Sequence, residues 1–396
     1  MTVALPILDE DEGEVTVVGR TACPEAHSAD PADLARITEP PDSAHAPGDP
    51  FSPYKVLHHF DRLQRIVAGE LVYPVTAEID PSNRCGHRCQ WCVSAQSHTG
   101  ENVEADDFRD LVLELKQLGV CSVVLKGGGE PTIHPEINDL LGACAEVGLA
   151  VGLITNGSFP RPDTIPAILA TTDWVRVSLD AASAETHRMI HGVSQFDRIA
   201  NHVQQLARDA ARTVIGLNFV AEPRNHHEIF AFTELARRWG ADYVSIRCVF
   251  DAGVALSAEI RREMCRQAEA AKTLEDDGFR VLLGNFTDQY LDADGDQPFP
   301  FRKCLGPNLV GVIGADGEVY PCCFLRGRKD LSFGNVREQS FRQIWSGPRR
   351  QAAMEAVYRG ACGHVCMGGM TSSRYNVYNE ILNYLACEEK PHAEFV

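Results

Sequence analysis

The sequence predicts an α/β fold built on a parallel sheet, and two periodic patterns support this prediction. Apolar, β-branched runs of strand length recur at residues 72–79, 120–125, 150–154, 174–179, 214–220 and 243–249. The segments between them carry apolar residues at helical spacing, as 108–118, 135–147 and 226–239 do. Strands that are apolar on both faces are typical of a parallel sheet covered by helices. We therefore expect six strand–helix units, in a sheet that is flat or curled into a partial barrel.

The composition divides the chain into three parts. Residues 1–50 are rich in Asp, Glu and Pro without a clear period, so we expect an arm that acts as a lid or is disordered. Residues 51–284 hold the strand–helix units. Residues 285–396 start irregularly and continue with a hairpin around Asp316-Gly317 and helices at 341–345, 348–358 and 374–385. This small C-terminal domain has little apolar mass, so we expect a metal centre or the main domain to stabilise it.

The charge and the length of the apolar runs exclude some classes of partner. Lys plus Arg number 37 and Asp plus Glu 55, which gives a net charge of −18 and argues against a nucleic-acid partner. The same charge would tolerate a cationic substrate. No apolar run is long enough to span a membrane, and the N-terminus lacks the basic start of a signal peptide. We expect a cytoplasmic protein whose 14 cysteines are reduced and serve as metal ligands.

Three of these cysteines, Cys85, Cys89 and Cys92, lie on the loop that follows the first predicted strand. In a parallel sheet, chemistry gathers at the C-terminal ends of the strands, where this loop starts. Three thiolates can hold three irons of a four-iron cluster and leave the fourth iron open for another ligand. An odd number of cysteines on one short loop fits neither a disulfide nor a zinc finger, although zinc remains the alternative.

These cysteines and the segment Lys126-Gly127-Gly128-Gly129-Glu130-Pro131 together resemble the signatures of the radical S-adenosylmethionine (radical SAM) enzymes. The resemblance covers residues 72–249. It implies a partial (β/α)6 barrel and a [4Fe–4S] cluster whose open iron chelates S-adenosylmethionine. It also implies a 5′-deoxyadenosyl radical that takes a hydrogen atom from an unactivated carbon, with the hard chemistry supplied by the cofactor.

The resemblance further implies a set of residues that contact the cofactor. Glycines would let the backbone approach its methionine end, an aromatic residue would lie near adenine, and polar residues that end the third and fourth strands would meet the ribose and methionine moieties. For the aromatic residue, ordinary core packing is the alternative. The implied residues are Trp91, Gly128, Gly129, Glu130, Asn156, Ser178 and Asp180.

The C-terminal part resembles the twitch or SPASM extension of the same superfamily. Cys304, and Gly317 followed by Cys322, match the opening of that extension, as do the segments 334–336 and 344–345. A full SPASM domain continues with more cysteines than this chain offers, so we expect one auxiliary cluster, a [4Fe–4S] cluster. Its expected ligands are Cys304, Cys322, Cys362 and Cys366, with Cys323 and Cys387 able to substitute. Zinc bound by the same thiolates is again the alternative.

The sixth predicted strand bears on the type of reaction. Alternation along the strand places Cys248 on the same face as Val244 and Ile246, and it places Arg247 on the opposite face. The apolar face should meet the helices, which points Arg247 inward, where it could hold substrate or help remove a proton. An inward Cys248 would instead donate a hydrogen atom and epimerise a carbon. We expect Arg247 to act in dehydrogenation, with the auxiliary cluster accepting an electron.

We therefore expect an oxidoreductase that dehydrogenates a small molecule, a sugar or aminocyclitol alcohol of antibiotic biosynthesis. A flavodoxin- or ferredoxin-type protein would donate the electron. Three alternatives stay open. The first is an epimerase of a sugar carbon with Cys248 as hydrogen donor. The second is an enzyme that matures a ribosomally made peptide. The third is a non-catalytic metal-binding or redox-sensing protein.

Overall fold

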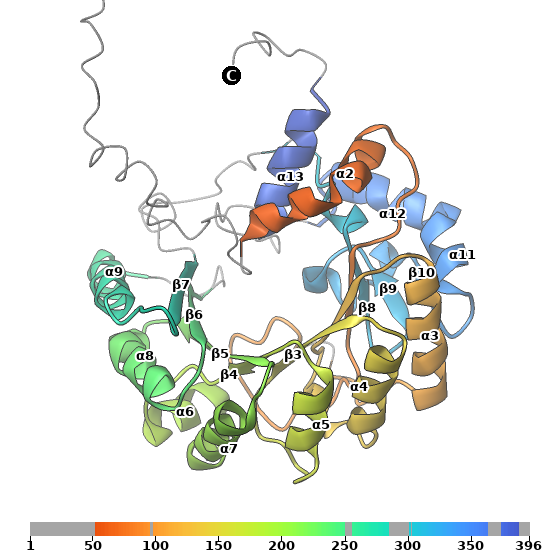
Figure 1. Cartoon of the computed structure of the whole chain (residues 1–396). Helices are drawn as coiled ribbons and strands as arrows, with labels where there is room; N and C mark the ends of the chain where they lie inside the picture. The colour runs from red at the N-terminus through yellow and green to blue at the C-terminus, as the bar shows by residue number, and fades with distance from the viewer. Residues whose placement is uncertain are drawn as a thin grey trace, which may run out of the picture. The chain divides into compact units, whose positions relative to one another are not determined.

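A parallel sheet with helices along its outside forms the main body of the protein (Figure 1). The computed structural model describes residues 52–95, 98–249, 256–284, 301, 303–362 and 374–387. The expected arm at 1–50 lies outside these residues. Strands β1 to β7 lie side by side in sequence order. They are β1 (Thr76–Ile79), β2 (Ser122–Leu125), β3 (Ala150–Thr155), β4 (Trp174–Ser178), β5 (Val214–Ala221), β6 (Tyr243–Cys248) and β7 (Arg280–Gly284).

The helices of this body follow the strands as the apolar spacing predicts. They are α3 (Ala105–Gln117), α4 (Ile137–Glu146), α5 (Thr164–Thr171), α6 (Ala184–His191), α7 (Phe196–Asp209), α8 (Ile229–Arg238) and α9 (Ala258–Lys272). The α/β fold with a parallel sheet is therefore confirmed. The sequence analysis missed α9 and β7 as a seventh unit, because the apolar run of β7 is only residues 281–283, between Arg280 and Gly284.

Side chains alternate cleanly between the two faces of β1–β7. One face packs against the helices and forms the main hydrophobic core, with residues such as Ile79, Leu125, Val177 and Phe219. We call the opposite face, made by the residues that alternate with these, the inner face. Polar side chains such as Ser178, Asn218 and Ser245 lie on this inner face.

The C-terminal domain continues the same sheet. Strand β8 (Val310–Ile313) pairs in parallel with β1, β9 (Glu318–Tyr320) pairs antiparallel with β8, and β10 (Gly334–Asn335) pairs with β9. Helices α11 (Phe341–Ser346) and α12 (Pro348–Tyr358) follow. The Trp345 indole is fully buried and donates a hydrogen bond to the carbonyl of Val72 at 2.8 Å. The C-terminal domain thus shares the hydrophobic core of the barrel. This shared core explains how a domain with so few apolar residues of its own can be stable.

Two further helices close one side of the molecule. The 3-10 helix η1 (Pro53–His59) leads into α2 (Phe60–Val67), which lies beside α13 (Arg374–Leu385) (Figure 1). Leu63 and Ile66 of α2 share a small core with Tyr378 and Leu382 of α13. The remaining 3-10 helices are η3 (Pro131–Ile133), η4 (His226–Glu228), η5 (Gly306–Asn308), η6 (Cys323–Leu325) and η7 (Lys329–Leu331). Within the described part of the chain, no helix has the length and apolarity needed to cross a membrane.

Candidate active site

Cys85, Cys89 and Cys92 lie half-buried on the loop that leaves the C-terminal end of β1. The loop is held by its own backbone, since the amide of Cys92 donates to the carbonyl of Cys89 at 3.3 Å. Burial raises the pKa of Cys85 to about 12 and also raises that of Cys92. These buried thiols would become thiolates at neutral pH only with a cation beside them, which a metal centre supplies. The donor set fits an iron–sulfur cluster.

The glycine segment 127–129 packs directly on this cysteine loop. The amide of Gly129 donates to the carbonyl of Ser82 at 3.0 Å, and the amide of Glu130 donates to that of Arg84 at 2.7 Å. A Cβ on Gly129 would lie 2.1 Å from the carbonyl oxygen of Arg84, and one on Gly128 would lie 2.4 Å from Oδ1 of Asn83. The glycines are therefore required by the packing of two loops, a reason that the sequence reading did not include.

Glu130, directly after the glycine segment, accepts hydrogen bonds from the following turn and from the end of β3. Its Oε1 accepts hydrogen bonds from the amide and hydroxyl of Thr132 and from the hydroxyl of Thr155, at 3.0, 2.7 and 2.6 Å. Its Oε2 accepts from the amide of Asn156 at 2.6 Å. Burial raises the pKa of Glu130, and these donors oppose the rise. Both oxygens thus accept hydrogen bonds within the protein, which ties the glycine segment to β3, and the expected contact with the cofactor stays a prediction.

Asn156, at the end of β3, offers a polar group suited to a ligand. Its Oδ1 accepts a hydrogen bond from the amide of Ser158 at 2.9 Å. Its Nδ2 is buried and has no hydrogen-bond partner among the described residues. Buried amides are nearly always paired, so an orphaned donor beside the glycine segment fits a bound cofactor.

Asp180 contacts two groups of the protein at the end of β4. Its backbone adopts a left-handed conformation, with φ of 56°. Its Oδ1 accepts a hydrogen bond from the amide of Val220 at 2.7 Å, and its Oδ2 lies 3.3 Å from Nε2 of His191. The carboxylate therefore orders the rim, and its expected contact with the cofactor stays a prediction.

His191 connects Asp180 to the cysteine loop, and the sequence reading missed it. Its Nδ1 lies 3.0 Å from Sγ of Cys89, and its Nε2 lies 2.9 Å from the carbonyl oxygen of Leu179. Burial would lower its pKa, but the hydrogen bonds with Asp180 and Cys89 raise it to about 10. Two buried histidines pack against it, and burial lowers the pKa of His87 to about 3 and that of His187 to about 4. The spacing His187–His191 on α6 was the available signal.

Two other predicted cofactor residues lie at this rim. The ring of Trp91 is half-buried, with its centroid 6.5 Å from that of His191. Ser178 lies on the inner face, opposite Asn218 of β5. A further link, absent from the sequence reading, ties the loop to β5. Arg224 donates to Oε1 of Gln90 at 2.7 Å and to a carboxylate oxygen of Glu222 at 2.8 Å.

Arg247 and Cys248 lie on opposite faces of β6. Arg247 is exposed on the inner face. Cys248 is buried in the main core on the helix side, as Met264 of α9 is. Burial raises the pKa of the Cys248 thiol to about 12. This thiol faces away from the inner face.

The C-terminal cysteines gather around a second point. Cys304, Cys322 and Cys362 pack against one small apolar cluster made by Leu325, Leu331 and Val357. Three thiols that converge in this way fit a metal centre. Cys366, the fourth expected ligand, lies outside the described residues. Cys387 is exposed, while Cys323 is adjacent to Cys322. The hydrogen bond with Cys322 lowers the pKa of Cys323 to about 6.

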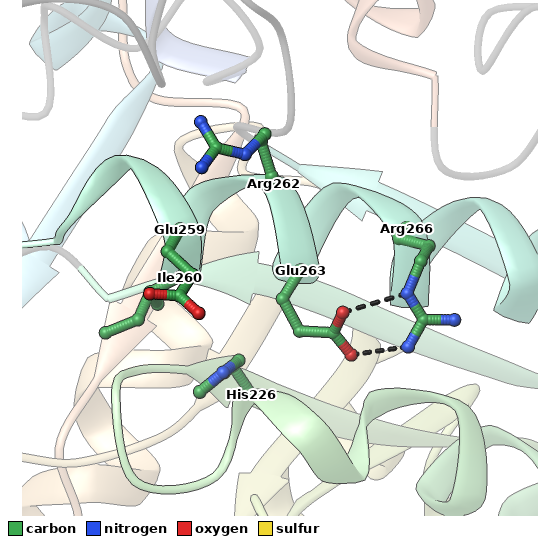
Figure 2. Close-up of a pocket in the computed structure, with 6 residues that line it drawn as sticks. All are labelled: His226, Glu259, Ile260, Arg262, Glu263 and Arg266. Atoms are coloured by element: carbon green, nitrogen blue, oxygen red, sulfur yellow. Dashed lines mark hydrogen bonds and ion pairs between the residues drawn. The ribbon is translucent and has the colours of Figure 1, made fainter.

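A separate hollow on the outer surface lies between η4 and α9 (Figure 2). It is lined by His226, Glu259, Ile260, Arg262, Glu263 and Arg266. Glu263 and Arg266 form a two-contact ion pair at 2.8 and 2.6 Å (Figure 2). None of the predicted site residues lines this hollow, and we do not assign it to the active site.

Comparison with protein families identifies both parts of this arrangement. The model of the radical SAM superfamily matches residues 79–229. The model of the SPASM iron–sulfur cluster-binding domain matches residues 304–367.

Several curated proteins are similar over most of the chain. The mycofactocin maturase MftC of Mycobacterium tuberculosis (strain CDC 1551 / Oshkosh) is 27% identical over 315 residues, 76% of this chain and 79% of the relative. The AdoMet-dependent heme synthase of Methanosarcina barkeri is 25% identical over 339 residues, 78% of this chain and 93% of the relative.

Two solved structures share the fold. SuiB of Streptococcus suis, bound to the precursor peptide SuiA, superposes with a TM-score of 0.60 at 17% identity, covering 84% of this chain and 77% of SuiB. The protein anSMEcpe, with bound AdoMet and the Kp18Cys peptide, gives a TM-score of 0.56 at 15% identity, covering 79% of this chain and 97% of anSMEcpe.

Proposed function

The chain is a radical SAM enzyme with a C-terminal SPASM domain, and from this premise we propose that it matures a peptide. The observation that carries the proposal is the similarity to mycofactocin maturases over 76% of the chain. The fold gives additional support, because two proteins that share it, SuiB and anSMEcpe, have structures with a bound peptide. Peptide maturation was one of the alternatives left open by the sequence, and it now replaces the small-molecule reading as the leading one.

The cofactors are a [4Fe–4S] cluster with S-adenosylmethionine and auxiliary iron–sulfur binding in the SPASM domain. When bound, they supply a 5′-deoxyadenosyl radical that takes a hydrogen atom from an unactivated carbon. We assign Cys85, Cys89 and Cys92 to the irons. We assign the free donor of Asn156 to the S-adenosylmethionine, with Trp91, Gly128, Gly129 and Ser178 in the same site.

Other residues of the chain would hold this site in place. Glu130 ties the glycine segment to β3, and Asp180 fixes the imidazole of His191 beside Cys89. These contacts would keep the cofactor in the correct orientation. A displaced cofactor would lose the alignment on which hydrogen transfer depends. We propose one auxiliary cluster at Cys304, Cys322, Cys362 and Cys366. A flavodoxin- or ferredoxin-type electron donor and a cytoplasmic location remain proposals.

Dehydrogenation of a sugar or aminocyclitol alcohol in antibiotic biosynthesis is the second candidate. It is favoured by Arg247, which lies on the inner face as that reading requires. Epimerisation with Cys248 as hydrogen donor has less support, because this thiol packs in the core on the helix side.

Release of 5′-deoxyadenosine separates the two candidates. The anaerobically reconstituted enzyme, reduced with dithionite, is mixed with S-adenosylmethionine and either a peptide pool or a pool of polyols and aminocyclitols. We expect the peptide pool to raise 5′-deoxyadenosine above the level without substrate, and the Cys89→Ala variant to form none. Stimulation by the polyol pool alone would overturn peptide maturation in favour of the second candidate.

A further inference from the structure

Helix α13 contacts the segment that carries Cys304, although the helix lies beyond the residues that match the SPASM domain. That match covers residues 304–367, and α13 starts at residue 374. Tyr378 and Leu382 anchor the helix in the small core that it shares with α2 and with Leu309. The helix is thus packed beside the start of the SPASM domain, five residues after Cys304.

Two asparagines of α13, Asn379 and Asn383, bind this segment through hydrogen bonds. They are one helical turn apart, so their side chains lie on the same side of the helix. Nδ2 of Asn383 donates to the carbonyl of Lys303 at 2.8 Å, and its Oδ1 accepts from the backbone amide of Lys303 at 3.1 Å. Oδ1 of Asn379 accepts from the backbone amide of Gly306 at 2.7 Å. The backbone on both sides of Cys304 is therefore bound to α13.

The other end of the Asn379 carboxamide faces the sulfur of Cys304. Its Nδ2 lies 3.5 Å from Sγ of Cys304. Gly306 determines this orientation, because a backbone N–H can only donate and must therefore meet the carboxamide oxygen rather than the NH2 group. Only 1% of the surface of Asn379 is exposed. Its donor is thus directed at the cysteine from within the protein.

A carboxamide is a suitable partner for a sulfur that binds iron. A cysteine thiolate can only accept hydrogen bonds, and the NH2 group of Asn379 donates at every pH. Hydrogen bonds to the sulfurs are among the factors that set the reduction potential of an iron–sulfur cluster. Because reduction adds negative charge, a donor to a ligand sulfur stabilises the reduced form and raises the potential.

We propose that Asn379 positions Cys304 for the auxiliary cluster and raises the reduction potential of that cluster by donating a hydrogen bond to the Cys304 sulfur. Asn379 is then a positioning residue that lies outside the SPASM match. The inference rests on the auxiliary cluster that is part of the proposed function, and it does not depend on a peptide as the substrate.

The reduction potential of the auxiliary cluster tests this role. The reconstituted enzyme is titrated without oxygen, and its reduced clusters are followed by electron paramagnetic resonance (EPR). Added S-adenosylmethionine changes the signal of the cluster whose open iron it chelates, so the unchanged signal belongs to the auxiliary cluster.

Asn379→Leu, which is similar in size but has no N–H donor, should lower the potential of the auxiliary cluster. At a fixed applied potential, the ratio of reduced to oxidised auxiliary cluster should fall about three- to tenfold. This change corresponds to a shift of about 30–60 mV, at 59 mV per tenfold for one electron.

Asn383→Leu is the matched control. It replaces the same type of side chain one turn further along α13 and removes two hydrogen bonds with Lys303, but its side chain contacts no cysteine sulfur among the described residues. We expect its auxiliary cluster to keep the potential of the unmodified enzyme. Equal potentials in Asn379→Leu and Asn383→Leu would overturn the hydrogen bond to Cys304 as the contact that sets the potential.

A second variant separates the donor from the packing of α13, in case Asn379→Leu takes up little iron. Asn379→Asp keeps an oxygen for the amide of Gly306 but replaces the N–H donor by a second oxygen. Its iron content should stay near that of the unmodified enzyme while the potential falls. Asn383→Asp, which places the same charge one turn away, is its control. A potential in Asn379→Asp that is no lower than in Asn383→Asp would contradict the proposal.

The outcomes also separate this inference from the assignment of the auxiliary cluster. If the unmodified enzyme shows a second EPR signal whose potential the Asn379 variants leave unchanged, the inference fails and the auxiliary cluster stands. If the unmodified enzyme shows no second signal and binds about four irons, the auxiliary cluster fails and the inference fails with it. Peptide maturation is tested independently, by the release of 5′-deoxyadenosine.

Discussion

The guanidinium group of Arg326 meets the carboxylate of Asp80 through two contacts, at 2.5 and 2.8 Å. Asp80 ends β1 at the start of the cysteine loop, and Arg326 follows Cys322 in the SPASM domain. Both side chains are buried, with 0% and 6% of their surface exposed. This pair links the SPASM domain to the start of the loop that carries Cys85, Cys89 and Cys92.

Breaking the pair should destabilise the protein strongly. Asp80→Asn leaves a buried guanidinium without its charge partner, and a change of this kind costs about 3–5 kcal/mol. The control is Asp330→Asn, which removes the partner of Arg328 in an exposed pair, where about 0–1 kcal/mol is expected. Urea unfolding of the apoprotein, followed by circular dichroism, measures both. Similar losses of unfolding free energy in the two variants would contradict a larger stabilising contribution of the buried Asp80–Arg326 pair.

Gly129 should not tolerate a side chain. The Cβ of Gly129→Ala would lie 2.1 Å from the carbonyl oxygen of Arg84, so the cysteine loop has to shift. We expect a loss of about 2 kcal/mol or more and reduced iron content after reconstitution. Gly142→Ala is the matched control, since that Cβ meets nothing within 4 Å and Gly142 lies within helix α4. There alanine should stabilise by about 0.5–1 kcal/mol. Normal iron content in Gly129→Ala would refute the loop packing as the reason for this glycine.

The auxiliary cysteines should account for half of the bound iron. Two four-iron clusters give about eight irons per chain. Cys322→Ala and Cys362→Ala should each lower this value to about four, and Cys387→Ala should leave it unchanged. Iron and acid-labile sulfide are measured on protein purified without oxygen. About four irons in the unmodified protein, with one zinc ion, would favour the zinc alternative.

The histidines behind the cysteine loop predict a pH dependence of stability. Burial lowers the pKa of His187 to about 4, from the usual histidine value of about 6.5. Between these values the unfolded chain binds a proton that the folded chain does not, so the free energy of unfolding falls as the pH falls through this range. His187→Gln should remove that part of the slope. Unfolding of both apoproteins between pH 7.5 and 4.5 provides the comparison, and parallel profiles would argue against a neutral, buried His187.

The sequence predicted the elements whose residues carry a local pattern. The apolar runs predicted β1–β6, and the spacing of Cys85, Cys89 and Cys92 predicted the cysteine loop. The sequence analysis missed β7, because the apolar run of this strand is only residues 281–283, between Arg280 and Gly284. The roles of side chains depend on partners that are distant in the sequence, and these contacts could not be predicted from local patterns.

Two residues illustrate this limit. His191 meets Cys89 across 102 positions, and Arg326 meets Asp80 across 246. No local pattern reports such contacts. The cofactor contacts of Glu130 and Asp180 were expected from the family resemblance, Glu130 as part of the glycine segment and Asp180 as a polar residue that ends a strand. The structure adds hydrogen bonds within the protein for both carboxylates, which the sequence did not predict.

The fate of one hydrogen atom tests peptide maturation most directly. Reduced enzyme is given S-adenosylmethionine and a peptide pool deuterated at carbon, and the 5′-deoxyadenosine is analysed by mass spectrometry. We predict that it gains one deuterium atom from the peptide pool. Unlabelled 5′-deoxyadenosine from every deuterated peptide, with deuterium gained instead from a deuterated polyol or aminocyclitol, would contradict the claim that a peptide is the substrate.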